Sequence, residues 1–242
     1  MTNKRQALVT GANKGIGLAI ARGLAQAGMS VWIGARDQVR GELAVAQLRE
    51  EGLDVGFLKL DVADDDSVRN AVLTLSSEID ALDVLVNNAG IAIDMTLPPS
   101  QVRMEDMKAV FEVNLFGPVR VTQAFLPLLK AGNQARIVMM GSGVGSLALI
   151  TDPTSIYSTV NLLDYTASKV ALSAVTVSFA KELEPLGIKV NVVEPGHVRT
   201  DLNGNSGFLS PEEGAVAAIK MALLEADGPT GGFFGSHGRQ PW

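Results

Sequence analysis

The sequence contains no cysteine, and among its 242 residues histidine occurs only twice, at His197 and His237. The missing thiols exclude disulfides, thiolate-bound zinc, thiol nucleophiles and cysteine-bound iron–sulfur clusters. With so few imidazoles, a zinc site would depend mainly on carboxylates, which is an uncommon choice for zinc. We therefore expect no metal site in this protein.

Basic clusters and long apolar runs are also missing. The chain has 20 Lys and Arg against 26 Asp and Glu, and its basic residues are dispersed, which disfavours a nucleic-acid partner. The longest apolar stretch, 137–150, is interrupted by glycines and serines and is too short to span a bilayer. The first residues, Met1–Gln6, lack the apolar core of a secretory signal. These features predict a cytoplasmic protein that contacts neither membrane nor nucleic acid.

The sequence does contain a regular alternation of short apolar runs and helical patterns, with 47% hydrophobic residues overall. Strand-like runs occur at 7–9, 31–33, 55–60, 84–86, 137–140, 190–193 and 232–235, the last expected at a sheet edge. Apolar residues at helical spacing cover 16–27, 39–50, 68–79, 104–130, 165–184 and 210–225. Strands that are apolar throughout and separated by helices indicate a parallel sheet buried on both faces.

The fold class predicted from this alternation is α/β: a doubly wound Rossmann fold, with a mostly parallel seven-stranded sheet and helices on both faces. The sequence shows no repeat, low-complexity tract or linker. We therefore expect a single Rossmann-type domain over 1–242. Residues 1–135 would form mainly its cofactor-binding half, and residues 136–242 mainly its catalytic and substrate half.

A glycine-rich loop, Thr10–Gly17, joins the first strand to the first helix. Glycines in such a loop allow a tight turn and let a pyrophosphate approach backbone amides at a helix N-terminus. The spacing is G-x3-G-x-G, and a glycine triplet alone is equally consistent with a plain turn. Its position between a strand and a helix favours dinucleotide binding.

The end of the second strand bears on the choice of cofactor. An acidic residue about 20 residues after the glycine loop usually binds the adenine ribose of a dinucleotide. Ala35 occupies that place here, and the adjacent Arg36 can form a bidentate contact with a 2′-phosphate, with Lys14 as a second cation. In the opposing interpretation, Arg36 is a solvated residue and Asp37 is the ribose acid. The first interpretation predicts that NADP(H) is favoured over NAD(H).

Tyr165 and Lys169 are separated by about one helical turn, so they share a face of the predicted helix. A nearby ammonium would favour the phenolate and lower the pKa of the phenol from about 10. That shift would make Tyr165 a usable proton donor and acceptor. A simple surface pair is the plain alternative. The second tyrosine, Tyr157, has Asn161 one turn later, lacks the cation and is a poor rival.

Together these motifs resemble the short-chain dehydrogenase/reductase family in its single-domain form. The resemblance covers nearly the whole chain, and the loop Gly11–Gly15 is nearest in pattern to the carbonyl-reductase branch. The matching segments, in the family's order, are Thr10–Gly17, Asp61-Val62, Asn87–Gly90, Asn114, Ser142, Tyr165 with Lys169, and Pro195-Gly196.

The resemblance implies a catalytic set. Tyr165 would be the general acid in carbonyl reduction, and Lys169 would lower its pKa and bind the nicotinamide ribose. Ser142 would donate a hydrogen bond to the carbonyl oxygen, and Asn114 would hold a water that links Lys169 to solvent. Structural roles compete, with Asn114 as a buried kink residue and Ser142 as one loop hydroxyl among several.

The same resemblance implies the cofactor contacts. Asp61 and Val62 would contact the adenine, Asn88 the adenosine side of the pocket, and Thr200 the nicotinamide end. Asn88–Gly90 could equally be only a turn. The expected cofactor-binding residues are Gly11, Asn13, Lys14, Gly15, Ile16, Gly17, Arg36, Asp61, Val62, Asn88, Ala89, Gly90, Tyr165, Lys169, Pro195, Gly196, Val198 and Thr200.

The chain departs from the family pattern in two places. Ser142 stands between two glycines where the family often has paired serines, and Ser146 is a less favoured substitute. The stretch between Ser142 and Tyr165 is longer than usual, and the extra length falls in Leu147–Leu163. This insert could form a wall of the substrate pocket or alter an oligomer interface.

These features predict an enzyme that reduces a ketone or aldehyde by hydride transfer from NADPH, with Tyr165 as the general acid. Walls formed by Ile91, Ile93, Leu147, Leu149 and the Asp201–Leu209 loop would suit an uncharged or mainly apolar substrate.

Two alternatives remain open, an NADP(H)-sensing regulatory protein on the same fold and an NAD-dependent alcohol dehydrogenase. A sugar-nucleotide epimerase would need more chain after Gly196, and a serine hydrolase would need a G-x-S-x-G segment that is absent. Related enzymes assemble through long helices, here 104–130 and 165–184, so a homodimer or homotetramer is expected.

Overall fold

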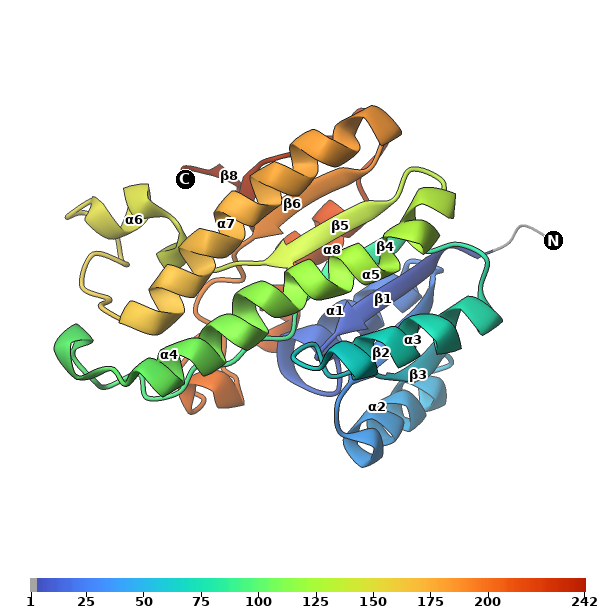
Figure 1. Cartoon of the computed structure of the whole chain (residues 1–242), viewed down its shortest axis with the longest axis horizontal. Coiled ribbons are helices and arrows are strands. Elements are labelled where there is room, and N and C mark those ends of the chain that lie inside the picture. Colours follow the sequence, from blue (N-terminus) through green and yellow to red (C-terminus); the bar gives the residue numbers. More distant parts are fainter. Residues whose placement is uncertain (1–3) are drawn as a thin grey trace.

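The computed structural model describes residues 4–242, so the first three residues of the predicted domain lie outside the described range. Within that range the chain forms an eight-stranded sheet in the order β3-β2-β1-β4-β5-β6-β7-β8 (Figure 1). Neighbouring strands from β3 to β7 pair in parallel, and β8 pairs antiparallel with β7. This confirms the doubly wound, mostly parallel fold. The strands are β1 (Gln6–Thr10), β2 (Ser30–Ala35), β3 (Val55–Lys59), β4 (Val84–Asn87), β5 (Arg136–Met140), β6 (Lys189–Val193), β7 (Phe233–Gly235) and β8 (Gly238–Gln240).

The expected strand count of seven is wrong for the described residues, because β8 adds an edge outside β7. Gly235 pairs with Gly238 across a two-residue turn, and Gly238 adopts a φ of 125°, which favours glycine. The strand Gly238–Gln240 contains no apolar side chain, so no hydrophobic pattern marks it. The predicted edge strand 232–235 is therefore an inner strand.

Helices cover both faces of the sheet. The apolar cluster around α1, α2 and α8 lies on one face, and the cluster around α3, α5 and α7 lies on the other (Figure 1). The helices are α1 (Gly15–Gln26), α2 (Gln38–Glu50), α3 (Asp65–Glu78), α4 (Met104–Phe111), α5 (Gly117–Ala131), α6 (Leu147–Thr151), α7 (Leu163–Leu183) and α8 (Pro211–Ala222). None of the helices in the described chain combines the length and hydropathy needed to cross a bilayer.

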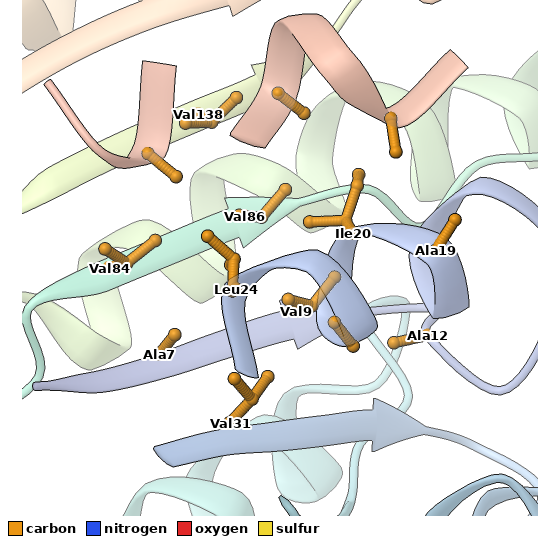
Figure 2. Packing of buried hydrophobic residues seen from close by; sticks show 14 of the residues in the cluster. Ala7, Val9, Ala12, Ala19, Ile20, Leu24, Val31, Val84, Val86 and Val138 are labelled. Carbon is orange, nitrogen blue, oxygen red and sulfur yellow. The ribbon is translucent and has the colours of Figure 1, made fainter. Parts of the chain in front are cut away.

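The core explains why the central strands are mainly apolar. Figure 2 shows Ile20 and Leu24 of α1 lying over side chains of the central strands, among them Val9 and Val86, all without exposed surface. Burying each such aliphatic side chain contributes about 1.5–3 kcal/mol. The central strands therefore form the rigid platform from whose carboxyl ends the loops emerge.

The strand order reverses between β1 and β4, which is where a parallel sheet opens a crevice for ligands. The loops after β1, β4, β5 and β6 converge at the carboxyl ends of these strands. These loops carry most of the residues that the sequence analysis selected.

The helical stretch predicted at 104–130 is interrupted. Five residues, Glu112–Phe116, form a π-helical turn between α4 and α5, and Asn114 at its centre is 1% exposed. Single π turns inside α-helices are frequent at functional sites because they disturb the regular backbone pattern. The helical pattern predicted the stretch but not this turn.

Candidate active site

The glycine loop has the backbone that a close ligand requires. Gly11 and Gly15 adopt φ values of 63° and 56°, a region that favours glycine. A Cβ on Gly17 would lie 2.5 Å from Nδ2 of Asn88, so only glycine fits there. α1 begins at Gly15 without a side-chain cap or an acidic residue in its first turn. This helix start, with no capping side chain and no negative charge, fits the pyrophosphate of a dinucleotide.

The loop after β4 is fastened to the glycine loop. The Thr10 hydroxyl accepts hydrogen bonds from the backbone amides of Asn88 and Ala89, each at 3.0 Å. The Asn88 side chain donates to the Thr10 carbonyl oxygen at 2.9 Å. A Cβ on Gly11 would lie 2.9 Å from Cα of Ala89. Asn88 therefore positions backbone here in addition to any contact with a nucleotide.

The residues expected to select the cofactor lie at the carboxyl end of β2. Arg36 is exposed directly after the strand, and Ala35 is buried. Asp37 is the N-cap of α2, and its carboxylate accepts from the Arg40 amide at 3.0 Å. That bond gives the carboxylate a structural function and weighs against the interpretation of Asp37 as the ribose acid.

Lys14, expected as a second cation beside Arg36, has a carboxylate partner. Its ammonium lies 2.5 Å from Oδ2 of Asp201, in the loop after β6. The Lys14 ammonium lowers the pKa of Asp201, and both side chains are more than half exposed. An exposed pair of this kind contributes little free energy and exchanges readily with other anions. It links the glycine loop to the segment that follows Thr200.

The expected adenine contacts, Asp61 and Val62, lie after β3. Val62 is buried and packs on Gly117, where a Cβ would lie 2.9 Å from its Cγ2. Arg120 of α5 donates to the Val62 carbonyl oxygen at 2.7 Å and to Glu112 at 2.6 Å, and it also pairs with Asp65. This network joins the segment after β3, where the adenine contacts are expected, to the π turn.

Tyr165, Lys169 and Ser142 meet where β5 ends. Lys169 is 4% exposed, and its Nζ donates to the Met140 carbonyl oxygen at 2.8 Å. Nζ lies 5.6 Å from the centre of the Tyr165 ring. The Ser142 hydroxyl interacts with the Tyr165 phenol. The structure thus brings together three members of the expected catalytic set.

The electrostatics differ from the expectation. Burial raises the pKa of Tyr165 to about 12, and the Ser142 hydroxyl offsets that rise only in part. Burial also lowers the pKa of Lys169 to about 8. The pKa of Tyr165 is therefore raised overall and not lowered, because burial dominates, and the lowering effect expected from Lys169 stays a prediction.

Asn114, the fourth expected catalytic residue, is held by its side chain. Its Oδ1 accepts from the Ile91 amide at 2.8 Å, and its Nδ2 donates to the Ile91 carbonyl oxygen at 2.9 Å and to Ser168 at 3.2 Å. A Cβ on Gly90 would lie 3.4 Å from Asn114 Oδ1 and 3.7 Å from Lys169 Nζ. Asn114 Oδ1 and Lys169 Nζ therefore both lie close to the bare backbone of Gly90.

The segment after β6 closes the other side of the crevice. Gly196 has a φ of 77°, Val198 is buried, and a Cβ on Gly15 would lie 3.6 Å from the Thr200 methyl group. Pro195 and Gly196 are partly buried. Thr200 therefore reaches the glycine loop directly, and Asn13 and Ile16 are partly buried in that loop.

A cavity of about 520 Å³ opens between the loops after β4 and β6. Of the expected substrate walls, Ile93 and part of the Asp201–Leu209 loop line it, whereas Ile91, Leu147 and Leu149 do not. It is lined by Ile93, Asp94, Met95, Thr96, His197, Leu202, Asn203, Gly204 and Ser206. His197, one of the two histidines of the chain, lies in its wall.

Several contacts that shape the site were not predicted from the sequence. Thr10 ends β1 and opens the predicted glycine loop, and its hydroxyl also binds the loop after β4. Tyr157 was dismissed as a rival proton donor, yet its hydroxyl donates to Glu194 at 2.7 Å. The local sequence does not predict the pairing of Tyr157 with Glu194, because the two residues are far apart in the chain. Among residues 4–242 no three His, Asp or Glu side chains are grouped to hold a metal ion.

Comparison with known proteins adds three findings. The family model described as short chain dehydrogenase matches residues 5–207. A short-chain dehydrogenase, anuI, from Penicillium roqueforti is 37% identical, over 89% of this chain and 87% of that protein. Carbonyl reductase [NADPH] 1 of Sus scrofa is 35% identical over 96% and 92% of the two chains. The solved structure of an NADPH-bound carbonyl reductase from chicken fatty liver has a TM-score of 0.85 and 28% identity, covering 99% of this chain and 100% of that chain.

Proposed function

This chain belongs to the short-chain dehydrogenase/reductase family and is an oxidoreductase, and from that premise we propose that it reduces a ketone or aldehyde to an alcohol with NADPH. One observation carries the proposal. The Asn88–Gly90 segment contacts the glycine loop through Ala89 and approaches Lys169 Nζ through Gly90. The nucleotide crevice and the Tyr165 cluster are therefore parts of one site.

The residues present fit NADPH. The glycine loop offers backbone amides to a pyrophosphate, and Arg36 is exposed at the end of β2 with no acidic residue at position 35. The proposed cofactor contacts also include Asp61, Val62 and Thr200. Relatives named as NADPH carbonyl reductases support the choice over NADH.

The proposed chemistry divides between the cofactor and the chain. NADPH, when bound, supplies the hydride that the carbonyl carbon accepts. The Ser142 hydroxyl donates a hydrogen bond to the carbonyl oxygen and stabilises the negative charge that develops there. Tyr165 gives its proton to that oxygen, and the products are an alcohol and a phenolate.

The high pKa of Tyr165 is compatible with this direction. Burial raises that pKa to about 12, so the phenol holds its proton at neutral pH and is ready to donate. A phenol is still a stronger acid than an aliphatic alcohol, so transfer to a developing alkoxide is favourable. The Lys169 ammonium stabilises the phenolate, and Asn114 holds the β4 loop beside Lys169, where a water can return the proton.

The experiment that tests the function measures NADPH consumption with a panel of ketones, aldehydes and β-ketoacyl thioesters, with NADH in parallel. Turnover of at least one carbonyl class, faster with NADPH, is the expected result. Cofactor binding without turnover of any carbonyl would favour an NADP(H)-sensing protein, and faster turnover with NADH would contradict the cofactor assignment.

The proposal also covers the two halves of the domain, the cellular location and the assembly of the protein. We propose that residues 1–135 mainly bind the nucleotide and that residues 136–242 mainly carry catalysis and substrate binding. We also propose a cytoplasmic location and assembly as a homodimer or homotetramer. Light scattering tests the assembly, since a mass near the 25.4 kDa of one chain would contradict it.

A further inference from the structure

The insert Leu147–Leu163 contacts the end of β6 through the side chain of Tyr157. The Tyr157 hydroxyl donates to Oε2 of Glu194 at 2.7 Å, and Glu194 directly precedes Pro195 at the end of β6. Burial and the Glu194 carboxylate both raise the pKa of Tyr157, so its hydroxyl keeps its proton. Tyr157 is thereby fixed as a hydrogen-bond donor to Glu194.

The ring of Tyr157 lies directly on Gly143. A Cβ on Gly143 would lie 2.1 Å from Cζ of the ring and 2.5 Å from its hydroxyl oxygen, so the ring is in contact with bare backbone. Gly143 is the neighbour of Ser142 and begins the short turn Gly143–Gly145. The ring therefore sets one side of the turn that carries the Ser142 hydroxyl.

The opposite side of the same turn is set by α7. A Cβ on Gly145 would lie 3.1 Å from both Cβ and the carbonyl oxygen of Lys169, and the Gly145 amide donates to the Ser142 carbonyl oxygen at 2.8 Å. The turn is thus enclosed between Tyr157 and the helix that carries Tyr165. Two close contacts at glycines therefore border the turn, Gly143 with Tyr157 and Gly145 with Lys169, and the Ser173 hydroxyl adds a hydrogen bond to the Gly145 carbonyl oxygen.

We propose that Tyr157 is a positioning residue for carbonyl reduction: held by Glu194, its ring presses on Gly143 and fixes the Ser142 hydroxyl beside Tyr165. This inference rests on the proposed function. The proposal assigns the insert a role in catalysis through Tyr157. Leu147 and Leu149, the insert residues expected in the substrate wall, do not line the cavity. The insert is anchored a second time where the Ala148 amide donates to the Trp242 main-chain oxygen at 2.9 Å.

A double-mutant cycle tests the proposal. Tyr157→Phe keeps the ring but loses the bond to Glu194, and kcat/KM for the carbonyl is expected to fall about tenfold with unchanged NADPH affinity. In a Ser142→Ala background the same change is expected to have almost no effect, because there is no hydroxyl left to position. An equal loss in both backgrounds would overturn the proposal in favour of a purely structural role.

Partner and control variants complete the design. Glu194→Gln retains an acceptor oxygen and is expected to cost less than threefold, while Glu194→Ala is expected to match Tyr157→Phe and not to add to it. Ile156→Ala, at a neighbouring position that is 73% exposed, is the matched control and is expected to leave kcat/KM unchanged. Thermal unfolding of each variant shows that it is folded. An inactive wild-type enzyme would defeat the proposed function, whereas an active enzyme indifferent to Tyr157→Phe would defeat only this inference.

Discussion

The ammonium of Lys169 lies 5.6 Å from the centre of the Tyr165 ring. It donates to the backbone of β5 at Met140 and not to the phenol oxygen. Its influence on Tyr165 is therefore exerted through space, and it depends on whether the amine is protonated. Burial lowers the pKa of Lys169 to about 8, which places this change close to neutral pH.

We first predict that carbonyl reduction slows as pH rises through about 8. Below this pH Lys169 is charged and stabilises the phenolate that Tyr165 becomes, and above it the amine is neutral while the Tyr165 pKa of about 12 keeps the phenol protonated. A kcat/KM profile between pH 6 and pH 10 measures the effect. In Lys169→Met the fall near pH 8 is expected to vanish on top of a lower rate. A fall that persists in this variant would assign it to another group.

The second prediction concerns the cofactor. Arg36→Asp is expected to weaken NADPH binding by about tenfold to a hundredfold and to leave NADH binding little changed, because only the 2′-phosphate is lost as a partner. Fluorescence titration with each cofactor measures the ratio. Arg69→Asp makes the same change of charge at an exposed position of α3 and is the control. An unaltered preference in Arg36→Asp would refute the role of Arg36.

The third prediction separates backbone strain from cofactor binding. Gly15 and Gly52 have φ values of 56° and 77°, so replacing either with alanine is expected to cost about 1–3 kcal/mol of unfolding free energy. Gly52 has open space around it, whereas the added methyl group at Gly15 points across the crevice toward Thr200. Gly15→Ala alone should weaken NADPH binding, as calorimetry with both variants can establish. Equal cofactor affinities would place the nucleotide elsewhere.

Much of the fold was predictable because its strongest signal is simple. Strands such as Val84–Asn87 are buried throughout and mainly apolar since both faces are covered, and that pattern with intervening helices is typical of a parallel sheet. β8 was not predicted because Gly238–Gln240 has no buried apolar side chain and so shows no hydrophobic pattern. The π turn at Asn114 was not predicted because the helical spacing of apolar residues continues across it.

The candidate site divides in the same way. Tyr165 and Lys169 are one turn apart on a helix, so their proximity follows from sequence alone. The pKa values of these two groups do not follow from the sequence, because they depend on burial by residues from other parts of the chain. Tyr157 and Glu194 come from distant segments, and only the folded chain shows that the dismissed tyrosine touches the turn beside Ser142.

The most direct test of the central claim is a single-turnover measurement of NADPH oxidation by Tyr165→Phe, beside the wild type, with a carbonyl that the wild type reduces. The account predicts that the variant binds NADPH with unchanged affinity and that its rate falls by about a hundredfold or more, since it keeps the ring but has no proton to give. A rate within a few fold of the wild type would show that Tyr165 is not the proton donor.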